Sequence, residues 1–306
     1  MTNSSCEKYL DKAPESTFTE SEVFSNYDNF KKFFDFIYYG STIQGTSNRV
    51  EKNNIATTFN LYIAGWPRKW SFEQLTELAD LGRIRDNHSI KAGTMGSNID
   101  LFVNANSSDG RPVLPWAFKT IRICNIALEK IKIQSWQGVA HEDIDDLTAQ
   151  AYFIRAYAHF CLFRLWGPMP YIKKVIGGYD QWDIPRLTKH ETLMNMAADL
   201  DTAIIYYKKA NRMRRDNPIV GAPGHLNHPD MFRPNGVAAM ALKGRILLYA
   251  ASPLNNELGV SEWQDAAVAN WEAIQSALQN GYALLTKDNY KLNYVGNNYT
   301  NEQLWG

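Results

Sequence analysis

The sequence predicts a mostly α-helical protein, a scaffold of tetratricopeptide-like helix pairs from which long loops emerge. Apolar residues recur every three or four positions over several long segments, which is the spacing of a helix with a buried face. Small residues stand at packing positions on these segments, and the segments follow one another in pairs, as in repeat proteins, although the period is irregular. The predicted helix pairs lie at about 115–166 (116–133 with 145–166) and 189–251 (189–210 with 236–251), followed by 264–281, whose helix 264–280 would pair with a later one.

The longest predicted helix, 145–166, is apolar nearly all round and is therefore expected to lie in the core. Gly167 is expected to end it. Pro168 forces the residue before it out of the helical region, and Pro170 keeps the exit extended. A helix with apolar residues on every side is covered by its neighbours, so this segment should be the centre of the fold.

The other helices carry their own start and stop signals. Pro115 suits the first turn of the helix that follows it. Three Ser/Thr residues with Glu or Gln three positions later predict capping boxes; these are Thr19 with Glu22, Thr188 with Glu191, and Ser261 with Gln264. Two apolar stripes are predicted; one comprises Leu193, Met196, Ala197, Leu200, Ile204 and Tyr207, and the other comprises Ala267, Trp271, Ile274 and Leu278 and closes at Gly281.

Composition excludes some functions and favours another. Lys and Arg total 32, as do Asp and Glu, so the chain has no net field that would attract a polyanion, and we expect no nucleic acid partner. Aromatic residues make up 13% of the chain, with 9 Trp and 16 Tyr. Aromatic faces beside amide groups suit neutral sugars, whose rings offer apolar faces edged with hydroxyl groups. The alternative is that most of the tryptophans fill a helical core.

The segment Ala149–Ile172, together with the opening Cys6–Lys12, resembles the SusD/RagB family, the surface lipoproteins that bind nutrients, mostly glycans, for TonB-dependent transporters in Bacteroidetes. Further segments resemble the family in the same order; they are 25–38, 116–131, 241–255, and 271–284 with 301–305. The resemblance implies a SusD-like helical domain over 19–306 that corresponds to the N-terminal part of the family fold. Relatives continue well beyond the segment like 301–305, so we expect the chain to be truncated at its C-terminus.

The three cysteines have different expected roles. Cys124 and Cys161 lie on apolar helix faces, where a free thiol behaves as a small hydrophobic group, so no disulfide is expected between them. Cys6 lies in a polar leader, 1–18, and the resemblance implies that it is the lipidated cysteine, which would place the protein at the cell surface on the outer membrane. Met1–Ser5 has no apolar stretch, so a signal peptide is absent from this sequence. The alternative is an unmodified cysteine in a flexible tail.

Four segments are longer than a compact helical repeat needs for its connections; these are 40–65, 84–115, 172–185 and 211–234. The resemblance implies that such loops build the glycan site. The candidate glycan-binding residues that they and their borders carry are Trp66, Trp70, Asn98, Asp100, Tyr179 and Trp182. For Trp66 and Trp70 the competing interpretation is that they anchor a loop on the core.

No catalytic motif is present in the sequence, which lacks GxSxG, a P-loop and GxGxxG, and we expect no enzyme, no cofactor and no metal. The pair His225 and His228 lacks the spacing of a zinc site. The acidic run 142–146 could suggest glycosidase carboxylates, but it opens a helix, where acidic residues meet the positive end of the helix dipole. The expected function is glycan binding with delivery to a SusC-like TonB-dependent transporter. The alternative is a helical adaptor that binds a protein, and a glycosidase is a distant third.

Overall fold

The computed structural model describes residues 20–39, 113–215, 233–293 and 300–305, and within these ranges the secondary structure is helical. The helices are α2 (Glu20–Ser25), α3 (Tyr27–Tyr39), α7 (Val113–Ile133), α8 (His141–Trp166), α9 (Lys189–Lys209), α10 (Gly236–Ala251), α11 (Val260–Gln279) and the 3₁₀ helix η2 (Tyr290–Asn293). The prediction of a mostly α-helical fold is confirmed.

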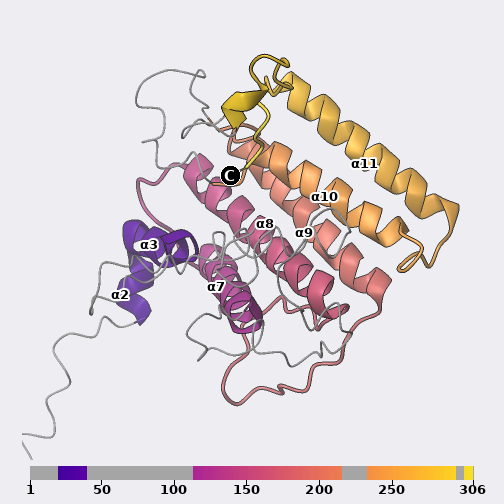
Figure 1. Ribbon diagram of the computed structural model, residues 1–306. Coiled ribbons are helices and arrows are strands. Elements are labelled where there is room, and N and C mark those ends of the chain that lie inside the picture. Colours follow the sequence, from indigo (N-terminus) through magenta and orange to yellow (C-terminus); the bar gives the residue numbers. More distant parts are fainter. Residues whose placement is uncertain (1–19, 40–112, 216–232, 294–299, 306) are drawn as a thin grey trace, which may run out of the picture.

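From α7 to α11, each helix packs against the next one in the chain, and α3 lies against α7 at the start of this row. Figure 1 shows that α8 is central and that α11 is the outermost helix of the row. Helices α8 and α10 both pack on α9, and they also touch each other. The arrangement is a stack of sequential helices, as the paired segments predicted.

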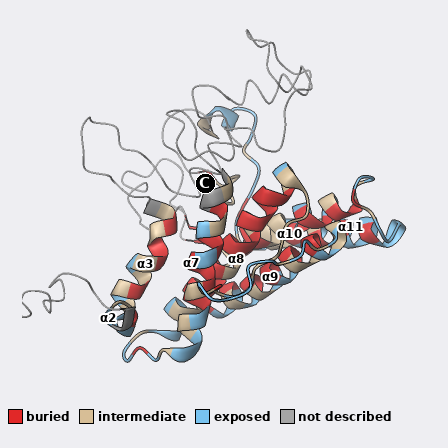
Figure 2. Cartoon of the chain, turned by 90° about the horizontal axis from the view of Figure 1, so that it is seen from below, coloured by how far each residue is buried: buried red, intermediate tan, exposed pale blue. Residues whose placement is uncertain are grey.

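Helix α8 is buried along most of its length, as predicted, and its buried residues run from Leu147 to Phe163 (Figure 2). It begins at His141, four residues before the predicted start, because the acidic residues Glu142 and Asp143 occupy its first turn. It ends at Gly167, which has a φ of 72° and whose N–H donates to the carbonyl of Phe163 at 2.8 Å. This positive φ favours glycine, so the stop signal is confirmed.

The three capping predictions have different outcomes. The Thr188 side chain accepts from the N–H of Glu191, and the Glu191 side chain accepts from the N–H of Thr188, which confirms a capping box at the start of α9. The predicted box at Ser261 is wrong. Helix α11 already begins at Val260 after Gly259, and the Ser261 hydroxyl donates to the carbonyl of Leu258 instead. Thr19 lies outside the described residues.

The apolar stripe predicted on α9 is buried, but the one on α11 is not. Trp271 is 62% exposed, and Ile274 and Leu278 are also exposed. Helix α11 packs on α10 through its opposite face, which carries small residues; these are Ala266, Ala269 and Ala273.

The Asn270 side chain of α11 lies directly against α10 at Gly244, which favours a face of small residues beside it. A Cβ atom built on Gly244 of α10 would lie 2.6 Å from Oδ1 of Asn270 on α11. The Asn270 amide uses that proximity, because it donates to the carbonyl of Gly244 at 3.0 Å and to that of Ala266 at 2.8 Å. A bulky face would hold the helices too far apart for this contact.

We predict that Gly244→Ala lowers the free energy of unfolding by about 1–3 kcal/mol, the usual cost of overpacking. The direction of this change is informative, because replacing a glycine within a helix by alanine otherwise raises the free energy of unfolding by about 0.5–1 kcal/mol. Thermal unfolding measures the effect. Gly178→Ala is the control, since a Cβ at Gly178 meets no atom within 4 Å. A melting temperature of Gly244→Ala at or above that of the wild type would contradict the proposed close packing.

Candidate functional site

Two of the predicted site residues, Tyr179 and Trp182, lie on the segment that connects α8 with α9, residues 167–188, which we call the strap. The strap leaves α8 at Gly167 and runs beside α7 before it enters α9 (Figure 1). Trp66, Trp70, Asn98 and Asp100 lie outside the described residues, as does Cys6, and their roles stay predictions.

The base of the strap is held by a buried ion pair between α8 and α9. Arg155, 4% exposed, binds both carboxylate oxygens of Asp199, with Nε–Oδ2 at 2.7 Å and Nη2–Oδ1 at 2.6 Å. Its Nη1 donates to Oδ1 of Asn125 on α7 at 2.8 Å. Such a bidentate pair satisfies the charges that burial would otherwise leave without water. Three helices therefore meet at one guanidinium group.

Asn125 links the buried ion pair to the backbone of the strap. Its amide donates to the carbonyl oxygens of Ile172 and Lys174 at 3.1 and 3.0 Å. Farther along, Arg122 Nη1 donates to the carbonyl of Ile176 at 2.7 Å. The strap is thus fixed along α7 by side chains that bind its backbone, so its course does not depend on secondary structure of its own.

His159 and Tyr171 complete the anchor. The Tyr171 hydroxyl donates to Oδ2 of Asp199 at 2.6 Å. The Tyr171 ring stacks on the His159 ring, with their centroids 3.9 Å apart. His159 Nδ1 lies 2.8 Å from the carbonyl of Arg155, which can only accept, and Nε2 lies 3.2 Å from the N–H of Ile172, which can only donate. Both contacts are satisfied only by a neutral imidazole protonated on Nδ1. Burial accordingly lowers the pKa of His159 to about 4.

Beyond this anchor, a short turn exposes the two aromatic residues. The Gly177 N–H donates to Oδ2 of Asp180 at 2.7 Å, and the Asp180 N–H donates to the carbonyl of Gly177 at 3.2 Å. Tyr179 is fully exposed and Trp182 is 64% exposed, so neither ring belongs to the core. Two exposed aromatic rings that follow a fixed loop base can receive a flat apolar ligand face.

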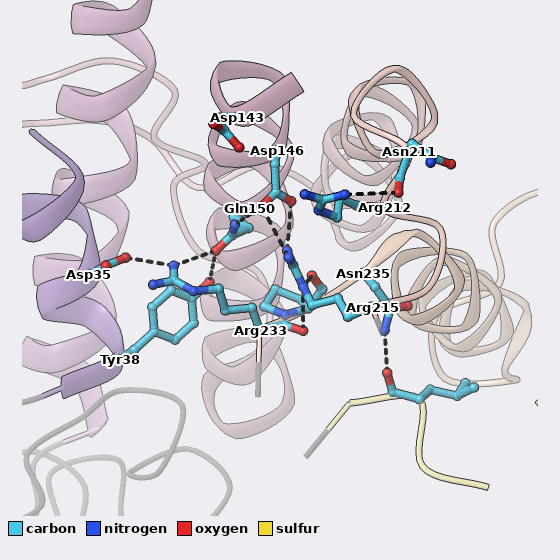
Figure 3. Close-up of polar contacts among 12 residues, drawn as sticks. Asp35, Tyr38, Asp143, Asp146, Gln150, Asn211, Arg212, Arg215, Arg233 and Asn235 are labelled. Carbon is cyan, nitrogen blue, oxygen red and sulfur yellow. Dashed lines mark hydrogen bonds and ion pairs between the residues drawn. The ribbon is translucent and has the colours of Figure 1, made fainter. Parts of the chain in front are cut away.

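A second buried network ties α3, α8 and the two borders of segment 216–232 together (Figure 3). Arg215 binds both oxygens of Asp146, at 2.7 and 3.2 Å, and its Nε donates to the carbonyls of Arg233 and Pro234. Arg233 in turn pairs with Asp35 of α3 at 2.7 Å and donates to Oε1 of Gln150 at 3.1 Å. Residues 215 and 233 are thereby brought together at α8.

This network corrects the interpretation of the acidic run 142–146. Glu142 and Asp143 do occupy the first turn of α8, as the dipole argument requires. Asp146 is the ion-pair partner of Arg215, 69 residues away, and it also accepts from Gln150 at 2.8 Å. The sequence contains no local signal for this pairing, because Arg215 follows two other arginines in a polar stretch.

The described part of the chain contains no group of three His, Cys, Asp or Glu side chains placed to hold a metal ion. Among the same residues, no helix is long and apolar enough to cross a membrane. Cys124 and Cys161 are buried free thiols, as predicted.

We predict that the anchor makes stability depend on pH. Below pH 6.5 the unfolded chain protonates His159, whereas the folded chain keeps it neutral until about pH 4. Stability is therefore lost as the pH falls from 6.5 towards 4, by about 2 kcal/mol at pH 5. Urea unfolding at pH 7.5 and 5 measures this loss, and His159→Gln should remove it, so that the gap between variant and wild type narrows at pH 5.

The exposed His141→Gln variant controls for the loss of an imidazole as such. A gap between His159→Gln and the wild type that stays the same at both pH values would show that the buried ring does not have the neutral form that its contacts require.

Comparison with known proteins agrees with this architecture. The model of a SusD-like family, described as starch-binding and associating with the outer membrane, matches residues 8–207, about two thirds of the chain. Curated protein sequences give no significant match.

Several solved structures from Bacteroides species have a similar fold. A SusD-like protein from Bacteroides fragilis has a TM-score of 0.59 and 17% identity, with 94% of this chain and 45% of that chain covered. A SusD-like carbohydrate-binding protein from the same organism has a TM-score of 0.55 and 17% identity, with 86% and 42% covered. Surface glycan-binding protein A from Bacteroides fluxus has a TM-score of 0.54 and 16% identity, with 94% and 50% covered.

The chain spans half or less of the length of these relatives. The likeness to them shows a shared helical fold, and the family model covers the helices that hold the strap. The sequence match and the fold lead to the same conclusion, and the chain belongs to the SusD-like family.

Proposed function

We propose that the protein is a non-enzymatic glycan-binding protein of the cell surface, anchored through Cys6 and delivering oligosaccharide to a SusC-like TonB-dependent transporter in the outer membrane. The observation that carries the binding role is the exposure of Tyr179 and Trp182 on the strap, whose base at 172–176 is held by α7. The description of the family as starch-binding supports a glycan as the ligand, and so do two structural relatives that are named as carbohydrate-binding and glycan-binding proteins.

A strap that is already ordered at its base favours ligand binding, because less conformational freedom is lost when the ligand binds. A ring that stacks on sugar loses rotational freedom on binding, and a mobile loop would add the cost of ordering its backbone. Here the backbone at 172–176 is already held by Asn125 and Arg122. The contribution of Trp66, Trp70, Asn98 and Asp100 to the same surface remains part of the proposal.

We predict that Trp182→Ala weakens binding of a polysaccharide by about 1–3 kcal/mol, the scale of a buried aromatic contact, without lowering the melting temperature. Affinity electrophoresis against a panel that includes starch gives the retardation, and calorimetry gives the affinity. Trp263→Ala is the matched control, because Trp263 is also an exposed tryptophan but lies on α11. Equal effects of the two variants would remove the strap from the site.

The same panel separates the proposed function from its alternatives. Release of reducing sugar by the purified chain would establish a glycosidase. Retention on no polysaccharide, together with stable capture of a protein, would favour the adaptor.

The transporter contact is proposed for the outer face of α11, which offers an apolar stripe on the row of helices. Its exposed members include Trp263, Trp271, Ile274 and Leu278. Contiguous exposed apolar surface of this kind marks interaction sites, since water is expelled when a partner covers it.

We predict that Trp271→Glu abolishes co-purification with the transporter from detergent extracts, because a carboxylate would be buried without a partner at the contact. Ile205→Glu on α9 is the control, since Ile205 is also an exposed apolar residue but lies off the stripe. Loss of co-purification in both variants, or in neither, would overturn the assignment to α11.

A further inference from the structure

A hollow of about 280 Å³ lies between α8 and α10, apart from the strap, and the chain end comes to it at Leu304 and Trp305. Figure 1 shows the end of the chain close to these two helices. Phe153, Tyr157, Phe160 and Arg164 line it from α8 at intervals of four, three and four residues, which places them on one helix face. Arg245 lines it from α10.

The wall of the hollow is aromatic. The Trp305 ring meets those of Phe153 and Tyr157 edge-to-face, at 5.0 and 5.2 Å between centroids. Tyr157 and Trp305 are only partly buried, so the wall remains accessible from the open side.

Two arginines stand at this aromatic wall without a carboxylate. None of the lining residues is acidic, and across the described ranges neither Arg164 nor Arg245 forms an ion pair. Arg164 lies with its guanidinium carbon 5.1 Å from the Phe160 ring centre, and its Nη2 contacts Sγ of Cys161 at 3.7 Å. Its Nε is buried and has no acceptor among the described atoms.

A buried donor without an acceptor is uncommon in a native protein, and a water molecule or a ligand can satisfy it. Arg164 of α8 and Arg245 of α10 both line this hollow. Two cations that act at one aromatic hollow suit a ligand with an apolar ring face and a negative group at its edge.

We propose that this hollow binds one hexuronic acid residue, with the sugar ring on the aromatic wall and the carboxylate at Arg164 and Arg245. The proposal rests on the proposed glycan-binding function and extends it to acidic saccharides at a second place on the chain. The volume lies just under the usual range for ligand pockets, which suits a single ring. A neutral sugar would offer the guanidinium groups hydroxyl oxygens but no negative charge, and an inorganic anion would make no use of the aromatic wall.

Calorimetry with the whole chain tests the proposal. The ligands are D-galacturonate and D-glucuronate, and their neutral counterparts are D-galactose and D-glucose. At least one acid should bind saturably and at least tenfold more tightly than its neutral counterpart. Added NaCl should weaken its binding, since the contact is charged. Equal affinity for acid and neutral sugar, or no binding of either acid, would overturn the proposal, and so would sulfate that binds as tightly as the acid.

Variants locate the site. Arg245→Gln should weaken binding of the acid at least tenfold without changing the melting temperature, because Arg245 is exposed. Arg164→Lys keeps a positive charge but loses the planar fork, and it should also weaken binding. Arg212→Gln is the control for the loss of one positive charge, since Arg212 lies beyond the end of α9. Equal affinities of Arg245→Gln and Arg212→Gln would overturn the assignment.

Failure of this inference can be told from failure of the proposed function. Suppose that the protein is retained on a neutral polysaccharide through Trp182 but binds neither uronate. The proposed glycan site on the strap would then stand, and the proposed uronate site in the hollow would be wrong. Uronate binding that depends on Arg245, without retention on any polysaccharide, would leave a small-acid site and remove the glycan-delivery function.

Discussion

The pairing of Arg155 with Asp199 is the interaction on which the described structure depends. Both groups are almost completely buried, and each charge is compensated only while the other is in place. The pair fixes α8 against α9, and its contacts with Asn125 and Tyr171 add α7 and the strap. Any other register of these helices would leave a charge buried alone, so the ion pair specifies one packing arrangement among those that an apolar helix such as α8 would tolerate.

The two arginine networks serve the same purpose at different places. Arg155 and Asn125 hold the strap, whereas Arg215 and Arg233 hold the borders of segment 216–232. Both networks are built on α8, the most buried helix of the row. Side chains that bind loop backbone to a rigid core helix allow long connections to differ in sequence while their bases stay fixed, which suits a scaffold that presents binding loops.

The sequence predicted those parts of the fold that are decided by residues close together in the chain, and it missed contacts between distant residues. Local signals succeeded, as at Gly167, at the Thr188 capping box and in the stripe along α9, because the deciding atoms lie within a few residues. Contacts between distant residues had no such signal, and Asp146 with Arg215 is the clearest case. On α11 the period was right but the buried face was not, because periodicity finds the larger apolar side chains and cannot detect that Gly244 on another helix selects the smaller ones.

The candidate site was predicted from residue types, and the structure shows how little such types decide alone. Trp136 is buried, stacks on Phe30 at 4.8 Å and donates to the carbonyl of Phe24, so it is a core residue. Trp271 lies on an uncovered helix face, and Trp182 stands exposed on the strap. The indole group is the same in all three. What distinguishes Trp182 is its place on the strap, whose base at 172–176 is held by polar side chains of α7 and α8. A binding surface on the strap would therefore depend on Arg155, Asn125 and His159 as much as on the rings that touch the ligand.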